Sequence, residues 1–186
     1  MAKIVDMRVI AGKYRGIVIP SPKEEIVKPT LDRIKENLFN IIQFNIQDAT
    51  VLDLFCGSGA LGIECLSRGA KETHFVDNNK QNIVSLKKFL DKINADGYFL
   101  HNLDYYDALK SFKENTFDIV FIDPPYDSEL AEIAIQKILR FNLLKDDGII
   151  VWEHPRDLQN NKFAQKVYDS RNYGTVTLDF IKKWLG

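Results

Sequence analysis

Five apolar runs, each but the last followed by an amphipathic stretch, occupy most of the chain after residue 50. We expect strands at 51–55, 73–77, 98–101, 117–122 and 148–152, separated by helices at 60–68, 79–93, 104–113 and 128–141. Near-continuous apolar strands that alternate with helices are typical of a parallel sheet covered on both faces. The sequence therefore predicts a doubly wound α/β fold, for which a chain of 186 residues has sufficient length.

The two ends of the chain depart from this alternation. Residues 8–19 contain Gly12 and Gly16 at turn positions, so we expect a short N-terminal β-hairpin there, followed by a helix over 30–43. Residues 163–171 and 175–181 predict a C-terminal hairpin. The whole chain, 1–186, is then one domain with a seven-stranded sheet.

Composition narrows the class of protein. The formal net charge is −1, and hydrophobic and charged residues make up 45% and 27% of the chain, as in ordinary globular proteins. No apolar run approaches about 18 residues, and no signal-peptide pattern is present, so we expect no membrane association. The only cysteines, Cys56 and Cys65, lack disulfide-framework spacing, and the three histidines are too scattered for a metal site. We expect a cytoplasmic protein without a metal.

A glycine-rich turn follows the first expected strand. Gly57 and Gly59 allow the backbone to approach a ligand closely, and Gly62 allows the next helix to pack tightly on the sheet. Asp53 lies inside the strand, where its carboxylate either orients the turn or meets the cofactor, unless it bonds only backbone amides. Asp77 ends the second strand, where an acid grips ribose hydroxyls or simply caps a helix. This pattern fits both S-adenosylmethionine and a nicotinamide cofactor.

The fourth expected strand ends in Asp123-Pro124-Pro125-Tyr126, whose two prolines hold the chain stiffly. The Asp123 carboxylate and the Pro124 carbonyl can accept both N–H bonds of a planar amino group, and Tyr126 can stack on the base. The alternative is a turn that only ends a strand. Because this tetrapeptide serves no hydride chemistry, it favours S-adenosylmethionine over a nicotinamide cofactor.

Basic residues gather near the N-terminus. Residues 8–35 contain seven basic and three acidic side chains, the basic ones being Arg8, Lys13, Arg15, Lys23, Lys28, Arg33 and Lys35. Arg8, Lys13 and Arg15, with Tyr14 between them, suit phosphate contact and base stacking on RNA, and Arg33 extends this face. A solvated surface of no particular function is the alternative.

With these segments in view, the chain resembles the bacterial family of methyltransferases that modify N2 of one guanine in 16S ribosomal RNA. The likeness runs from Arg8 to about Lys182 and rests on the segments 8–16, 28–33 with Glu36 and Phe39-Asn40, 53–62 and 121–126. It implies a Rossmann-like class I methyltransferase fold with strand order 3-2-1-4-5-7-6 and strand 7 antiparallel. It also implies S-adenosylmethionine as cofactor, with 16S ribosomal RNA or the assembling small subunit as partner.

The resemblance also implies residue roles. Asp104 is expected to meet the adenine amino group, with Asn102 as its rival and helix capping as the alternative, while Asn78 flanks the adenine. The expected cofactor-binding residues are Asp53, Gly57, Gly59, Asp77, Asn78 and Asp104, and the catalytic ones are Asp123, Pro124 and Tyr126. Adenine-N6 methylation of DNA, methylation of protein amides, a nicotinamide-dependent oxidoreductase and a non-catalytic nucleotide-binding module stay open as alternatives.

Overall fold

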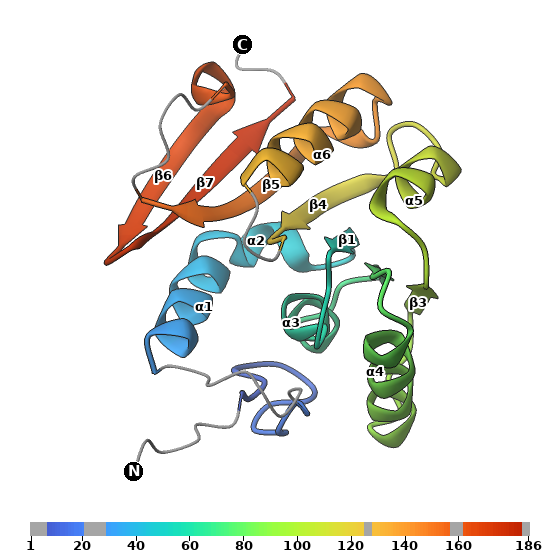
Figure 1. Cartoon of the computed structure of the whole chain (residues 1–186). Helices are drawn as coiled ribbons and strands as arrows, with labels where there is room; N and C mark the ends of the chain where they lie inside the picture. Colours follow the sequence, from blue (N-terminus) through green and yellow to red (C-terminus); the bar gives the residue numbers. More distant parts are fainter. Residues whose placement is uncertain (1–6, 21–28, 125–127, 157–161, 184–186) are drawn as a thin grey trace.

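A seven-stranded sheet forms the centre of the protein (Figure 1). The computed structural model describes residues 7–20, 29–124, 128–156 and 162–183. The sheet has the order β3-β2-β1-β4-β5-β7-β6, and β7 runs antiparallel to both of its neighbours while the other pairings are parallel. The strands are β1 (Thr50–Leu54), β2 (Glu72–Val76), β3 (Tyr98–His101), β4 (Phe117–Ile122), β5 (Leu144–Pro155), β6 (Val167–Tyr173) and β7 (Val176–Lys182). The strand order and the direction of strand 7 expected from the sequence are confirmed.

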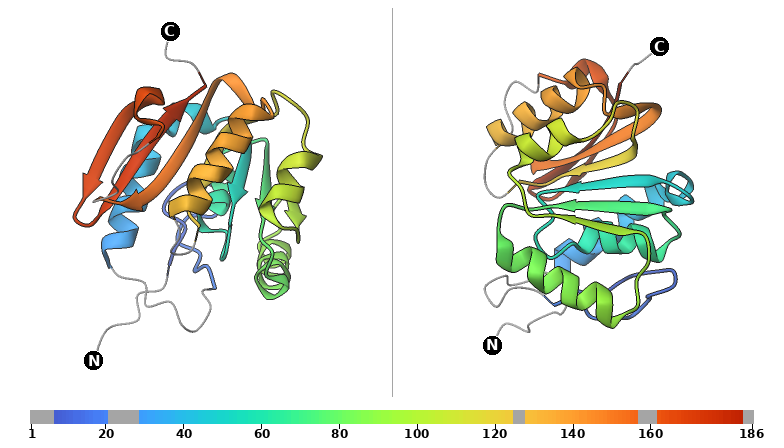
Figure 2. Two further views of the ribbon diagram at one scale, coloured as in Figure 1. Left: turned by 45° about the horizontal axis from the view of Figure 1, so that its top comes forward. Right: turned by 90° about the vertical axis from the view of Figure 1, so that its right-hand side faces the viewer.

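Helices cover both faces of the sheet (Figure 2). They are α1 (Pro29–Ile41), α2 (Gln43–Ile46), α3 (Ala60–Ser67), α4 (Lys80–Lys92), α5 (Tyr105–Ser111) and α6 (Ser128–Arg140), with a 3-10 turn, η1 (Ala164–Lys166), before β6. The helices α5 and α6 pack on one face, and α1 and α3 on the other. Among the helices of the described residues, none has the length and apolarity needed to span a membrane.

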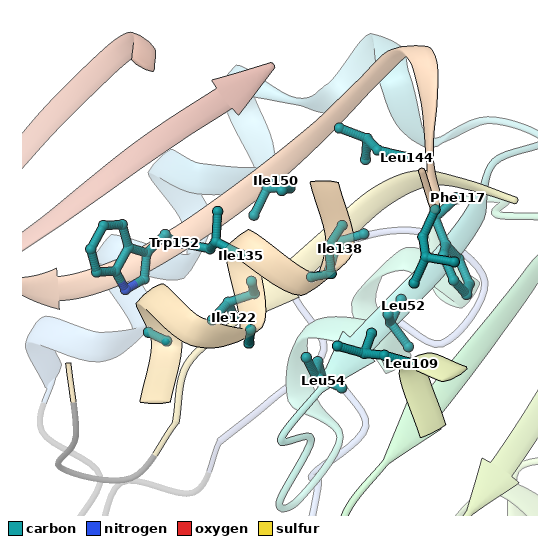
Figure 3. Close-up of a cluster of buried hydrophobic side chains, with 14 of the residues drawn as sticks. Leu52, Leu54, Leu109, Phe117, Ile122, Ile135, Ile138, Leu144, Ile150 and Trp152 are labelled. Atoms are coloured by element: carbon teal, nitrogen blue, oxygen red, sulfur yellow. The ribbon is translucent and has the colours of Figure 1, made fainter. Parts of the chain in front are cut away.

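The alternation of side chains along each strand divides the core between the two faces. Leu52, Ile122 and Trp152 point toward α5 and α6, where they join a fully buried cluster (Figure 3). Their sequence neighbours Phe121 and Val151 point to the opposite face and pack with α1. Burial on both faces is why these strands read as continuous apolar runs.

Three elements differ from the expectations. The helix expected over 30–43 ends at Ile41, and α2 follows as a separate short helix. The strand expected over 148–152 is longer in both directions. Pairing with β4 extends β5 back to Leu144, and pairing with β7 extends it forward to Pro155. The strand expected over 163–171 begins only at Val167, since η1 occupies the preceding residues.

The expected N-terminal hairpin is present in a reduced form. Residues 8–19 fold back on themselves, but only one antiparallel bridge forms, between Arg8 and Val18. The amides of Ile10 and Ala11, at the tip side of the segment, bond to a side chain of α3 instead of to a facing strand. Since those donors are used elsewhere, no longer ladder can form.

Candidate active site at the carboxyl edge of the sheet

The turn after β1 is tied to the start of α4 by one carboxylate. The amide of Gly57 donates to Oδ2 of Asp77 at 2.9 Å, and the same oxygen accepts from Nδ2 of Asn82 at 3.1 Å. The amide of Asn79 donates to Oδ1 of Asp77 at 2.7 Å. Each carboxylate oxygen accepts up to two hydrogen bonds, so Asp77 retains capacity for a ribose hydroxyl while it shapes the turn.

The two glycines of the turn differ in what surrounds them. Both have a positive φ, +52° at Gly57 and +77° at Gly59. A methyl group at Gly57 would meet no atom within 4 Å, whereas at Gly59 it would lie 2.7 Å from Cδ1 of Leu86. A side chain at Gly57 would therefore project into open space, while the space beside Gly59 is filled by Leu86 of α4. Phe55, just before them, also has a positive φ of 69°, a strained conformation that is common at binding sites.

Asp53 is buried on β1 and holds the beginning of α3. Its side chain is 4% exposed, and its Oδ2 accepts from the Gly62 amide at 2.9 Å. Burial raises the pKa of Asp53 to about 7; the charges of Asp123 and Asp77 add to the rise, and the bond from Gly62 opposes it. This hydrogen bond comes from a backbone amide, as the alternative of a purely structural carboxylate expects, and contact of Asp53 with a cofactor stays a prediction.

Two polar residues follow β3 and hold neighbouring turns. Nδ2 of Asn102 donates to the carbonyl oxygens of Asp77 and Asn78, at 3.0 and 3.1 Å. Oδ1 of Asp104 accepts from the amide of Tyr106 at 2.9 Å and caps α5. The capping alternative thus holds for Asp104, while Asn102 fixes the turn that carries the exposed Asn78.

Asp123 and Pro124 follow β4 directly, with Asp123 exposed and Pro124 buried. Tyr126 lies outside the described residues. The pairing of Ile122 with Trp152 makes Asp123 and Glu153 the next residues on two adjacent parallel strands. Glu153 is half-buried, and its pKa is raised to about 7, first by burial and then by the charge of Asp123, although His154 opposes the rise. Glu153 is not among the residues predicted from the sequence, although an acid immediately after the apolar run 148–152 was a usable signal.

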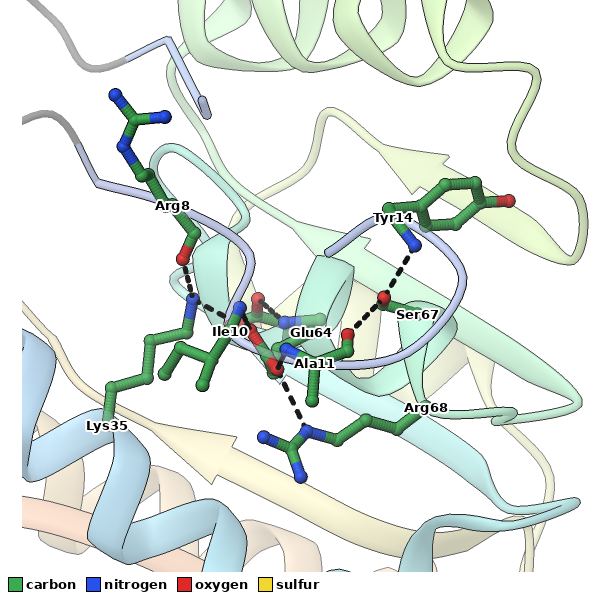
Figure 4. A network of polar contacts seen from close by, with 10 residues as sticks. Arg8, Ile10, Ala11, Tyr14, Lys35, Glu64, Ser67 and Arg68 are labelled. Atoms are coloured by element: carbon green, nitrogen blue, oxygen red, sulfur yellow. Dashed lines mark hydrogen bonds and ion pairs between the residues drawn. The ribbon is translucent and has the colours of Figure 1, made fainter. Parts of the chain in front are cut away.

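The N-terminal segment, residues 7–19, is fixed to α3 by a buried carboxylate (Figure 4). Glu64 has no exposed surface and accepts from the amides of Ile10 and Ala11 at 2.8 and 3.0 Å. It also pairs with Nζ of Lys35 at 3.1 Å and with Nε of Arg68 at 2.8 Å. The basic segment is therefore held in one position against α1 and α3 by Glu64, a residue that was not predicted from the sequence.

The expected RNA-contacting residues are divided by exposure. The basic side chains are exposed, namely those of Arg8, Lys13, Arg15 and Arg33. Tyr14 is only 6% exposed and packs in the cluster between the N-terminal segment, α3 and α4. Its ring has little surface to offer a base, so Tyr14 is better assigned to anchoring the segment.

The histidines are less scattered than the sequence analysis assumed. Nδ1 of His74, on β2, lies 3.0 Å from Nε2 of His101, on β3. The third histidine, His154, lies on β5 and bonds to Asp179 on β7. No group of three metal-ligating side chains occurs within the residues described. Both cysteines are free and buried.

The strand order, the antiparallel β7, the glycine turn after β1 and the Asp-Pro sequence after β4 together define a class I methyltransferase fold. More narrowly, the chain belongs to the family described as conserved hypothetical protein 95, whose family model matches residues 7–182.

Similar proteins agree with this assignment. Ribosomal RNA small subunit methyltransferase D of Haemophilus influenzae is 39% identical over 155 residues, which cover 82% of this chain and 80% of that protein. The Escherichia coli protein of the same name is 37% identical over 142 residues, 76% of this chain and 68% of the relative. The solved structure of yhhF from Escherichia coli has a TM-score of 0.85 at 28% identity and covers 96% of this chain and 98% of that one. The structure of HI0767 from Haemophilus influenzae has a TM-score of 0.81 at 32% identity, with coverage of 97% and 100%.

Proposed function

We propose that this protein transfers a methyl group from S-adenosylmethionine to the N2 amino group of a guanine in 16S ribosomal RNA. The observation that carries the proposal is the adjacency of two turns at one edge of the sheet. Leu54 pairs with Ile122, so the glycine turn after β1 lies beside Asp123 and Pro124 after β4. The choice of substrate is supported by two relatives that are named as methyltransferases of small-subunit ribosomal RNA.

The residues around the glycine turn fit the cofactor. S-adenosylmethionine, when bound, supplies an electrophilic methyl group on a sulfonium. The open side of Gly57 admits its methionine portion, and Asp77 takes the ribose hydroxyls. Asn78, with Asp104 or Asn102 after β3, borders the adenine at the crevice beyond the carboxyl ends of the strands. Asp53 holds α3 and the turn in place from beneath.

Asp123 and Pro124 hold the nucleophile. The exocyclic amine of guanine is conjugated with its ring and is a weak nucleophile, so it must pyramidalise before it attacks. The Asp123 carboxylate and the Pro124 carbonyl accept its two N–H bonds and favour that geometry. The bound S-adenosylmethionine would supply the methyl group as its S–C bond breaks, and the proton lost from the methylated nitrogen would pass to water. In this proposal Tyr126 stacks on the extruded base.

The RNA side of the protein is the N-terminal extension. We assign phosphate contact to Arg8, Lys13, Arg15 and Arg33, carried on residues 8–19 and 30–43. The attachment of the segment to α3 keeps the charges of Arg8, Lys13 and Arg15 at a set distance from the chemistry. The partner is 16S ribosomal RNA, free or in an assembling small subunit, which places the protein in the cytoplasm, and the chemistry requires neither a metal nor a membrane.

The test is transfer of radiolabelled methyl groups to 16S ribosomal RNA, followed by identification of the modified nucleoside. Asp123→Ala is expected to lower turnover by about 100-fold or more while S-adenosylhomocysteine binds as before. Asp146→Ala, a matched change at an 87%-exposed carboxylate near the start of β5, is the control and should retain activity. Near-normal turnover of Asp123→Ala would refute the mechanism, and label on adenine would instead favour the N6 alternative.

A further inference from the structure

Glu153 lies in the proposed site without a role in the reaction described above. It follows Trp152 on β5 and lies opposite Leu178 on β7, while Asp123 follows Ile122, the β4 residue that pairs with Trp152. The position is half-buried. Within the part of the chain that the structure describes, no hydrogen-bond donor and no ion-pair partner contacts its carboxylate. A half-buried carboxylate at a substrate site is an acceptor open to a ligand.

Strand alternation brings Glu153 and Asp123 to the same face of the sheet. Phe121 and Val151 both belong to the core that α1 covers. Side chains two residues apart along a strand share a face, so Asp123 and Glu153 also face that side. Neighbouring strands are about 4.8 Å apart. The two carboxylates therefore stand side by side at the carboxyl edge of the sheet.

The electrostatics agree with this placement. Burial, followed by the charge of Asp123, raises the pKa of Glu153 to about 7, and Asp123 also raises the pKa of Asp53. Like charges held this close repel each other, and N–H donors from a ligand would relieve that repulsion. The edge is thus suited to a ligand that presents several adjacent donors.

We propose that Glu153 is a specificity-determining residue that accepts a hydrogen bond from N1–H of the target guanine while Asp123 and Pro124 hold its N2 amine. The inference rests on the proposed function. Guanine carries N1–H and the N2 amino group on neighbouring ring atoms, so it offers adjacent donors to adjacent acceptors. Adenine has an unprotonated N1 beside its amine, and the lone pair on that nitrogen would face the ionised Glu153 carboxylate. Glu153 therefore selects guanine over adenine through both attraction and repulsion.

The test distinguishes recognition of N1–H from recognition of the N2 amine that is methylated. 2-Aminopurine keeps the amine on C2 but has an unprotonated N1. We would prepare 16S ribosomal RNA by splinted ligation, with guanine or 2-aminopurine at the position that the wild-type protein labels. The value of kcat/KM would be measured on both RNAs for the wild type and for Glu153→Gln, whose amide can either donate to N1 or accept from it. Glu114→Gln is the matched control, because Glu114 is exposed and lies just before β4, at the end of the strand opposite to Asp123.

We expect the wild-type preference for guanine over 2-aminopurine to fall about 10-fold or more in Glu153→Gln, within the range of a base-edge contact. The control should keep the wild-type preference. Intrinsic differences in reactivity between the two bases cancel in this comparison. S-adenosylhomocysteine affinity should be unchanged in all three proteins.

A merely structural role for Glu153 would lower both rates together, so a preference within twofold of the wild-type value would overturn this inference while the proposed function stands. Failure of the wild type to label 16S ribosomal RNA at all would overturn the proposed function, and this inference with it.

Discussion

Replacement of Glu64 by alanine tests how firmly the N-terminal segment is joined to α3. Glu64 is fully buried and accepts hydrogen bonds from the amides of Ile10 and Ala11 as well as from Lys35 and Arg68. Lys35 is itself only 7% exposed and also donates to the Arg8 carbonyl at 3.2 Å, so its ammonium stays buried when the carboxylate of Glu64 is lost. Arg68 is 16% exposed, lies at the end of α3 and is closer to solvent.

The expected loss in the free energy of unfolding is about 3–5 kcal/mol. Each orphaned amide costs about 1 kcal/mol or more, and removal of one partner from a buried ion pair costs about 3–5 kcal/mol. These terms overlap, because the same cavity lets water reach both the amides and Lys35, so they are not added. In a protein of this size the loss corresponds to a fall in Tm of roughly 10 °C.

The measurement is urea denaturation followed by circular dichroism, with the slope of the transition compared between proteins. Glu114→Ala, at an exposed carboxylate that accepts only from Asn142 among the described contacts, is the control and should change stability by less than about 0.5 kcal/mol. Adding Lys35→Met to Glu64→Leu should recover at least about 1 kcal/mol relative to Glu64→Leu alone, because no buried ammonium is then left without its carboxylate. A loss below about 1 kcal/mol in Glu64→Ala, with an unchanged slope, would refute the reasoning.

Two further changes test the glycine turn and the buried carboxylate beneath it. Gly59→Ala should destabilise the protein by about 1–3 kcal/mol, because its methyl group would lie 2.7 Å from Leu86. Gly57→Ala should cost only about 1 kcal/mol for its positive φ, yet it should weaken the binding of S-adenosylhomocysteine, measured by calorimetry. Equal destabilisation by the two changes would contradict the packing argument. Burial raises the pKa of Asp53 from 3.8 to about 7, so between these values the folded protein holds a proton that the unfolded chain has lost, and stability falls as pH rises through that window. Asp53→Asn removes this dependence, so its stability relative to the wild type should be higher at pH 8 than at pH 4 in urea denaturation; the same difference at both values would show that Asp53 does not titrate this way.

Most of the fold could be predicted from the chain alone, because the features that define it are local. Apolar runs of strand length and helices with one apolar face repeat along the sequence, and their alternation permits few arrangements. The glycine turn and the Asp-Pro-Pro-Tyr segment were also visible, since each places its functional groups within a few residues. The errors lay at boundaries, such as the start of β6, where pairing partners decide which residues extend.

The remaining features of the site depend on contacts between distant segments. Glu64 stands in a mostly apolar helix, but partners of its side chain come from residues 10, 11 and 35, so only the packed structure shows what it binds. Tyr14 looked like an exposed stacking residue until the segment around it was seen to close against α3 and α4.

The class of fold, the glycine turn and the Asp-Pro-Pro-Tyr segment can be recognised in the sequence, because each is encoded by neighbouring residues. The tertiary structure alone decided that Glu153 stands beside Asp123, since that adjacency arises from the register of β4 and β5. It also decided that the basic segment is clamped by Glu64, because burial of a charge is resolved only when its partners from several elements meet.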